Sequence, residues 1–205
     1  MGTHQRRASE KEHRRQSILE AAEVLMQESG LSGLTIDDVA TQTQLAKGTI
    51  YLYFKSKEDI LAALTLKARR VLYNEFAHAV ESSHDPLVGI ERLILANYTF
   101  YKQHPLHYEL TAFYNANTLN ETDELKQVYW DITKLVTELI NKAKADGQVR
   151  SDLDPIMFAM CLWGTTSGVI QLFKVRAAEL TADYQLEDMQ ILQLFTDILI
   201  KGIRA

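Results

Sequence analysis

Residues 35–61 read TIDDVATQTQLAKGTIYLYFKSKEDIL and predict two short helices joined by a tight turn. A capping-box arrangement opens the first helix, which we expect over Ile36–Thr43. The second is expected over Lys47–Phe54, with Ile50 and Phe54 one turn apart on its inner face. Only about three residues separate the two helices, and this is the spacing of a helix-turn-helix.

A longer helix is expected on each side of this pair. The preceding helix is predicted to begin at Ser9, which forms a capping box with Glu12, and to end at Gly30, because glycine tolerates the left-handed backbone of a helix stop. Ser56 is predicted to cap the following helix, which continues to about Ser82. The first 57 residues therefore predict a compact unit of three helices that leads into a fourth.

The remainder of the chain predicts further helices and no sheet, because apolar residues recur at intervals of three and four. The chain has only three prolines, Pro86, Pro105 and Pro155, and few glycines to interrupt these helices. Segments 106–116 and 187–203 are each expected to form one helix. We therefore expect an all-α fold of about nine helices.

Charge is distributed unevenly along a chain whose net charge is −5. Residues 1–57 carry eight Lys or Arg and seven Asp or Glu, whereas the remainder carries 14 and 20. A mildly basic head on an acidic body suits a local contact with DNA.

Cysteine content and hydropathy favour a cytoplasmic location. The single cysteine, Cys161, excludes a disulfide within the chain and is expected to be a small buried side chain. The first 17 residues lack the apolar stretch of a signal peptide. Residues 155–173 lack charge and approach the length of a membrane span, but they include polar side chains and lack basic residues on both flanks. A buried helix of a soluble oligomer is therefore expected, with no membrane.

The string from Ala46 to Leu61, with Gly-Thr-Ile-Tyr-x-Tyr-Phe followed by Lys-Ser-Lys-Glu, resembles the DNA-binding signature of the TetR family. The resemblance is close over residues 14–62 and covers only architecture elsewhere. It implies a helix-turn-helix DNA-binding domain at 9–57 and an effector-binding and dimerisation domain at 58–205. It also implies a homodimeric repressor that a small apolar or aromatic effector releases from a palindromic operator.

Seven residues are expected at the DNA: Thr35, Lys47, Gly48, Thr49, Tyr51, Tyr53 and Lys57. Side chains at the start of the second helix of a helix-turn-helix enter the major groove, and hydroxyl and ammonium groups around it contact phosphates. Glycine in this helix leaves room for close approach to the DNA. Family members often carry a polar residue at or just before Ala46, so base contacts from Leu45 and Ala46 stay open.

A basic arm precedes this unit and begins its first helix, formed by Arg6, Arg7, Arg14 and Arg15. It can reach the DNA backbone or minor groove, as basic arms do. For Arg6 and Arg7 a solubilising tail is an equally good interpretation.

Aromatic and histidine side chains concentrate in the second half and suggest an effector pocket. The residues predicted to line it are Tyr98, Tyr101, His104, His107, Tyr108, Phe113, Trp130 and Trp163. Ordinary core packing is the alternative for most of them. His104 and His107 with Glu109 suggest a metal site, but Pro105 leaves their geometry unfixed, so no metal is predicted.

The last two helices are expected to form a four-helix bundle with a second copy. The predicted interface residues are Gly164, Ser167, Gly168, Leu192, Phe195 and Leu199. Alternatively, the two glycines make room for a ligand at the pocket wall.

One other function stays open at this stage. A helical binding or adaptor protein that no longer reads DNA fits Ala46 and the acidic total. An enzyme is not predicted, because the sequence lacks a phosphate loop, a nucleophile motif and a Cys/His pairing. No cofactor is predicted either.

Overall fold

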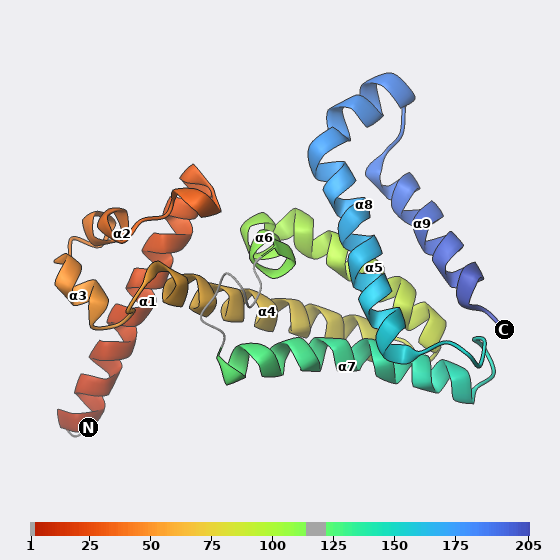
Figure 1. The fold of residues 1–205 in the computed structure, drawn as a ribbon, viewed down its shortest axis with the longest axis horizontal. Helices are drawn as coiled ribbons and strands as arrows, with labels where there is room; N and C mark the ends of the chain where they lie inside the picture. The colour runs from red at the N-terminus through yellow and green to blue at the C-terminus, as the bar shows by residue number, and fades with distance from the viewer. Residues whose placement is uncertain (1–2, 114–121) are drawn as a thin grey trace. The chain divides into compact units, whose positions relative to one another are not determined.

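The computed structural model describes residues 3–113 and 122–205. Within these ranges the chain forms nine α-helices and one 3-10 turn, with no strand beyond an isolated bridge between Val149 and Arg204 (Figure 1). The elements are α1 (Thr3–Ser29), η1 (Leu31–Gly33), α2 (Ile36–Gln42), α3 (Lys47–Tyr51), α4 (Lys57–Glu81), α5 (Pro86–Gln103), α6 (Pro105–Phe113), α7 (Asp123–Ala145), α8 (Pro155–Tyr184) and α9 (Asp188–Ile203). The predicted all-α fold is confirmed.

Side-chain caps begin several of these helices, including α4, where the predicted cap Ser56 accepts from the amide of Asp59 at 3.3 Å. Thr35, Asp85 and Asp154 each accept a hydrogen bond from a backbone amide in the first turn that follows, at 3.1, 2.8 and 2.8 Å. Such a bond satisfies one of the amides that have no partner inside the helix. Pro86 and Pro155 follow the two aspartates at the position where proline loses no hydrogen bond.

Two predicted helix boundaries are wrong. α1 begins at Thr3 and runs through Ser9, so the predicted capping box with Glu12 does not start it. Residues 5–15 are mostly good helix formers, which continue the helix past a serine. α3 ends at Tyr51 instead of Phe54, and the next three residues form a turn that leads to α4.

Two further helix ends differ from expectation. The sequence pattern predicts that α8 ends near Glu179, but it continues to Tyr184, and Gln185 closes it in the left-handed conformation with φ of 54°. α6 ends at Phe113, and the rest of the predicted segment 106–116 lies outside the described residues.

The chain packs as two compact units, which we call unit 1 (residues 1–68 and 106–126) and unit 2 (residues 69–105 and 127–205). Unit 1 therefore contains the helix-turn-helix together with the start of α4, α6 except for Pro105, and the start of α7. The predicted division at residues 57 and 58 concerns function and stays a prediction.

Unit 1 has a continuous apolar core built around α1. Ile18 and Ala22 of α1, Val39 of α2 and Ile50 of α3 are fully buried in it, and the prediction that Ile50 and Phe54 are core residues is confirmed. Leu110 of α6 and Leu125 of α7 join the same core. Leu110 and Leu125 come after residues 69–105 of unit 2 in the sequence, yet they complete the core around the helix-turn-helix.

Unit 2 is organised by α5, which packs against both α8 and α9. The ring of Tyr98 meets the ring of Phe173 edge to face, with centroids 5.8 Å apart. At the other end of α5, Gly89 lies against Leu139 of α7 so closely that a Cβ on the glycine would be 2.9 Å from a Leu139 methyl carbon. Glycine at this position therefore sets how closely α5 and α7 approach.

α8 is buried along only one side. Among the described residues it is the one helix whose length and composition would allow it to cross a membrane. Only 33% of its most apolar window is buried within the protomer. Phe158, Leu162 and Phe173 face inward, whereas Met157 is exposed. Cys161 is exposed as well, so its predicted burial is wrong for the single chain. An apolar run cannot show which of its sides a protomer covers.

We predict that Gly89→Val destabilises unit 2 by about 1–3 kcal/mol, because the added methyl groups overpack the contact with Leu139. Urea unfolding followed by circular dichroism measures this. Gly202→Val is the matched control, since a Cβ there meets no atom within 4 Å, and it should stay within about 0.5 kcal/mol of the parent. Equal stability of the two variants would contradict the close approach of α5 and α7.

Candidate nucleic-acid interface

A four-residue connection orients α3 against α2. Gln44 adopts the left-handed conformation with φ of 56°, and the amide of Leu45 donates to the carbonyl oxygen of Ala40 at 3.0 Å. Val39 and Ile50 are completely buried on the inner sides of the two helices. The predicted helix-turn-helix geometry is present, with α3 held firmly through its inner side.

The outer side of α3 is exposed and carries most of the predicted DNA contacts. Lys47, Gly48 and Tyr51 are exposed, and a Cβ on Gly48 would meet no atom within 4 Å. Thr49 and Tyr53 are half-buried, and Thr35 is exposed at the start of α2. Six of the seven predicted residues are thus at least partly accessible on α3 or on the residues that flank α2 and α3, while Lys57 begins α4.

The two predicted lysines already have partners within unit 1. The Lys47 ammonium lies 2.8 Å from a carboxylate oxygen of Asp37, and a hydrogen bond to this carboxylate raises the pKa of Lys47. The Lys57 ammonium donates to the carbonyl oxygen of Ser32 at 3.2 Å. Any DNA group that contacted either lysine would have to replace its present partner.

Two contacts that support this surface were not predicted from the sequence. The Arg15 guanidinium lies over the ring of Phe54, 5.2 Å from its centroid, and so ties α1 to the turn after α3. Asp59 accepts from the backbone amide of Lys55 at 2.9 Å and fixes the start of α4. The sequence predicted Arg15 only as part of a basic arm. Its contact with Phe54 could not be predicted, because the two residues are 39 positions apart in the sequence.

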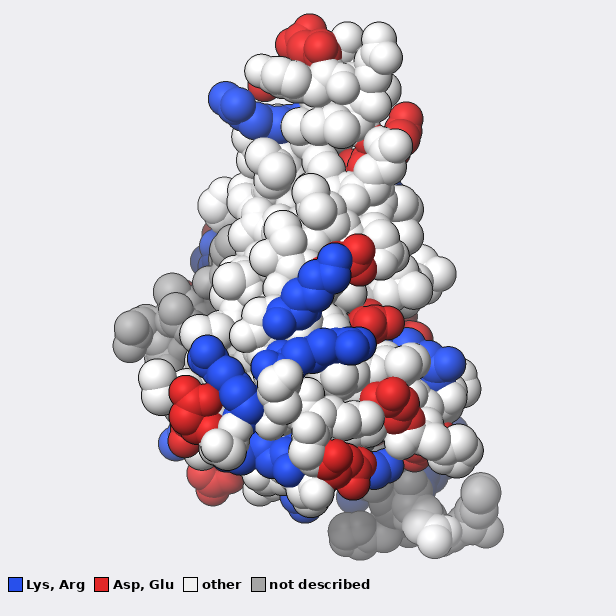
Figure 2. Space-filling model, turned by 90° about the vertical axis from the view of Figure 1, so that its right-hand side faces the viewer, with Lys and Arg blue, Asp and Glu red and all other residues white. Residues whose placement is uncertain are grey.

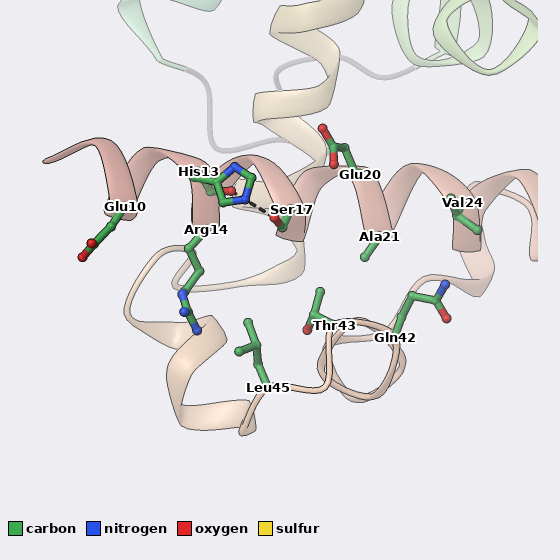
Figure 3. A pocket seen from close by; sticks show the side chains of 10 residues that line it. All are labelled: Glu10, His13, Arg14, Ser17, Glu20, Ala21, Val24, Gln42, Thr43 and Leu45. Carbon is green, nitrogen blue, oxygen red and sulfur yellow. Dashed lines mark hydrogen bonds between the residues drawn. The ribbon is translucent and has the colours of Figure 1, made fainter. Parts of the chain in front are cut away.

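A groove of about 540 Å³ runs between α1 and the α2–α3 connection (Figure 3). It is lined by Glu10, His13, Arg14, Ser17, Glu20, Ala21, Val24, Gln42, Thr43 and Leu45. The Arg14 side chain extends from α1 across the groove toward the Leu45 side (Figure 3). Two carboxylates and one guanidinium line the groove, so it is not a strongly basic surface.

Comparisons with known proteins agree with this geometry. Residues 18–64 match the family model described as bacterial regulatory proteins, tetR family. The chain is 24% identical over 175 residues to the HTH-type transcriptional regulator UidR of Escherichia coli strain K12, covering 85% of this chain and 83% of UidR. It is 22% identical over 165 residues to the HTH-type transcriptional repressor KstR2 of Mycolicibacterium smegmatis, covering 78% and 80% of the two chains.

A solved structure shares the fold. The crystal structure of the transcriptional regulator FadR from Bacillus subtilis in complex with stearoyl-CoA aligns with a TM-score of 0.71 at 18% identity, covering 92% of this chain and 99% of FadR. The chain is a TetR-family transcriptional regulator. It therefore belongs among DNA-binding regulators and not among enzymes.

In this TetR-family chain the predicted effector residues fall in both units. Tyr98, Tyr101, His104, Trp130 and Trp163 belong to unit 2, whereas His107, Tyr108 and Phe113 belong to unit 1. The side chain of Phe113 lies outside the described residues. The structure therefore does not gather all eight within one unit.

Within unit 2, the Tyr98 hydroxyl donates to Asp188 of α9 at 3.0 Å, and burial together with this carboxylate raises the pKa of Tyr98 to about 12. Tyr98 is also next to Tyr101, with ring centroids 6.3 Å apart. His104 stacks near Phe100. Trp130 is 57% exposed on the protomer, so it does not line an enclosed cavity of unit 2.

Within unit 1, Tyr108 is fully buried and the Nε2 atom of His107 lies 3.1 Å from a Glu23 carboxylate oxygen. The two histidines of the rejected metal site thus belong to different units. Among the described residues, no three His, Cys, Asp or Glu side chains are grouped as metal ligands.

The predicted dimer residues are only partly available on the protomer surface. Leu192 is 3% exposed, so its assignment to the interface is wrong: it packs inside unit 2. Gly164 and Gly168 are exposed, and Ser167, Phe195 and Leu199 are half-buried. Uncharged atoms dominate the upper part of the face seen in Figure 2, where α8 and α9 lie.

Further apolar side chains of α8 and α9 are exposed beside them: Ile156, Met157, Met160, Val175, Leu194 and Ile198. We call these six side chains with Gly164 and Gly168 the α8–α9 apolar face.

We predict that Asp37→Asn tightens binding to all DNA duplexes by roughly 3- to 10-fold at low salt, because it frees Lys47 and removes a negative charge beside the expected phosphate path. Fluorescence anisotropy with labelled duplexes measures this. Glu138→Gln is the matched control, since Glu138 is an exposed acid paired with Lys134 at 3.5 Å in α7. Unchanged affinity of Asp37→Asn would mean that this carboxylate lies away from DNA.

Proposed function

We propose that this chain is a homodimeric, ligand-responsive repressor that binds a palindromic operator through α2 and α3. The observation that supports this most directly is the two-sided character of α3. Its Ile50 side is completely buried, whereas Lys47, Gly48 and Tyr51 are exposed on the other side. A short helix anchored in this way presents a fixed set of groups to the major groove.

The proposed roles follow from the chemistry of each exposed group. Thr35 and Lys57 contact phosphates, and Tyr53 does so through its hydroxyl. Lys47 and Thr49 reach base edges, with Tyr51 offering its ring to a thymine methyl group or its hydroxyl to a phosphate. Gly48 allows the α3 backbone to approach the DNA.

The proposed dimer uses the α8–α9 apolar face. A palindrome read by two recognition helices requires them about 34–36 Å apart, which a two-fold axis between protomers provides. Gly164 and Gly168 carry no side chain that would hold a partner helix away. Pairing of this face would also remove Met157, 69% exposed, and Ile198, 62% exposed, from water.

The proposed effector is a small apolar or aromatic molecule that binds in the cytoplasm. Aromatic side chains of unit 2, among them Tyr98, Tyr101 and Trp163, offer the chemistry that such a ligand needs. Similar proteins support an apolar effector: FadR was crystallised with stearoyl-CoA, and KstR2 of Mycobacterium tuberculosis is described as a ketosteroid transcriptional regulator. The purified protein is incubated with acyl-CoA thioesters or with steroids, and its thermal unfolding is measured. The compounds that raise the unfolding temperature identify the chemical class of the effector.

Loss of DNA reading is the alternative, and the pairing of Lys47 with Asp37 is the observation that favours it. Mobility shifts against the DNA upstream of the coding sequence and against random duplexes separate the two. A helical adaptor would shift none of them.

We predict that Lys57→Ala weakens binding to specific and random duplexes alike and lowers the slope of log K against log salt by about 1 per protomer, because one phosphate contact is lost. Titrations at several salt concentrations give this slope. Lys134→Ala, which removes an exposed lysine from α7, should leave it unchanged. An unaltered slope for Lys57→Ala would remove this residue from the interface.

We predict that Ile198→Glu converts the dimer to monomers at micromolar concentration, because it places a charge inside the paired apolar faces. Sedimentation velocity reports the mass directly. Asn141→Glu, which adds the same acid at an exposed position on α7, should remain dimeric. A dimeric Ile198→Glu protein would place the interface elsewhere.

A further inference from the structure

Three side chains from three helices of unit 1 meet in one polar cluster. Both carboxylate oxygens of Glu23 in α1 accept from the Lys67 ammonium of α4 at 2.9 Å. One of them also lies 3.1 Å from the Nε2 atom of His107 in α6. We call Glu23, Lys67 and His107 the α1–α4–α6 cluster.

The cluster is largely shielded from water. The side chains of Glu23 and His107 are each 16% exposed, and that of Lys67 is 39% exposed. Burial opposes ionisation of Glu23, yet its contacts with His107 and Lys67 outweigh this effect and lower the pKa of Glu23 below its ordinary value. Partly buried ion pairs add little net stability against apolar packing, but they fix one geometry, because breaking them leaves a buried charge without its partner.

The neighbours of the cluster give this geometry a consequence. Glu23 lies beside Ala22 in α1, the helix whose buried side packs with Val39 and Ile50 of the helix-turn-helix. On the other side of the cluster, α6 inserts Leu110 into the same core. The position of α6 therefore affects the packing under the surface that we propose binds DNA.

α6 is also joined by the chain to unit 2 at both ends. The chain passes from unit 2 into unit 1 at residues 105–106 and returns to unit 2 at residues 126–127, inside α7. Because only His104 separates α5 from α6, a rearrangement of α5 in unit 2 can displace α6.

We infer that Glu23 is a positioning residue: together with His107 and Lys67 it holds α6 in the arrangement in which α2 and α3 bind DNA. This inference rests on the proposed function and adds its regulation. An effector that shifts α5 would weaken DNA binding by drawing His107 away from Glu23. Coupling of this kind requires a contact with two arrangements of different affinity for DNA, and the cluster provides the contact.

The test uses the full-length chain and a duplex selected from a random pool by the unsubstituted protein. Glu23→Gln keeps the size of the side chain and removes its charge. We expect hydrogen exchange of the α6 amides to accelerate about 10-fold and affinity for the selected duplex to fall about 5- to 20-fold. Glu28→Gln, which changes an exposed acid on the same helix α1, should do neither.

A pair of substitutions at His107 distinguishes loss of the contact with Glu23 from general unfolding. His107→Gln retains a nitrogen that donates toward Glu23 and should bind the duplex within about 2-fold of the parent, whereas His107→Phe should resemble Glu23→Gln. Thermal unfolding by circular dichroism establishes that each variant remains folded at the assay temperature.

Faster exchange of α6 with unchanged affinity for the duplex would overturn the inference, because the cluster would then only stabilise unit 1. Equal behaviour of His107→Gln and His107→Phe would overturn it too. If the unsubstituted chain selects no duplex, the proposed function itself fails and the inference fails with it.

Discussion

Burial of the inner side of α3 in the core of unit 1 is the constraint on which the rest depends. α3 has five residues, and a helix of that length has no stability of its own in water. It exists because Ile50 is completely buried and Phe54, just beyond its end, is 3% exposed in a core shared with Ile18 and Ala22. The outward positions of Lys47 and Tyr51 follow from that anchoring. A DNA-reading surface is thus a consequence of apolar packing on the opposite side of one short helix.

Local chemistry explains why much of the fold could be predicted from the sequence. The caps at Thr35, Asp85 and Asp154 act within three residues, so their signals survive without knowledge of the partner helices. The same locality explains the errors. Serine is a residue type that often caps helices, but good helix formers on both sides of Ser9 continue α1 through it. At α3, the apolar spacing of Ile50 and Phe54 predicted a longer helix, whereas the structure buries Phe54 from a turn.

Contacts between distant residues could not be predicted, because no periodicity encodes them. The exposed acid Asp37 and Lys47 are ten residues apart, and Glu23 and His107 are 84 residues apart. In α9 the difficulty is different. Apolar residues occupy both sides of that helix, so the sequence could not show that Leu192 faces the protomer core while Leu194 and Ile198 remain exposed. Cys161 was misplaced for the same reason within the uncharged stretch of α8.

The internal partners of the lysines bear on how a chain with net charge −5 binds DNA at all. Each lysine at the proposed surface exchanges one partner for another when DNA binds: Lys47 leaves Asp37 for a base edge, and Lys57 leaves the carbonyl oxygen of Ser32 for a phosphate. The net gain per contact is then smaller than for an unpaired lysine, since the bond within the protein is lost when the bond to DNA forms. A regulator that must be released by a small molecule benefits from this balance. An effector supplies only its difference in affinity between two conformations, typically a few kcal/mol, and that suffices when the DNA contacts are themselves modest.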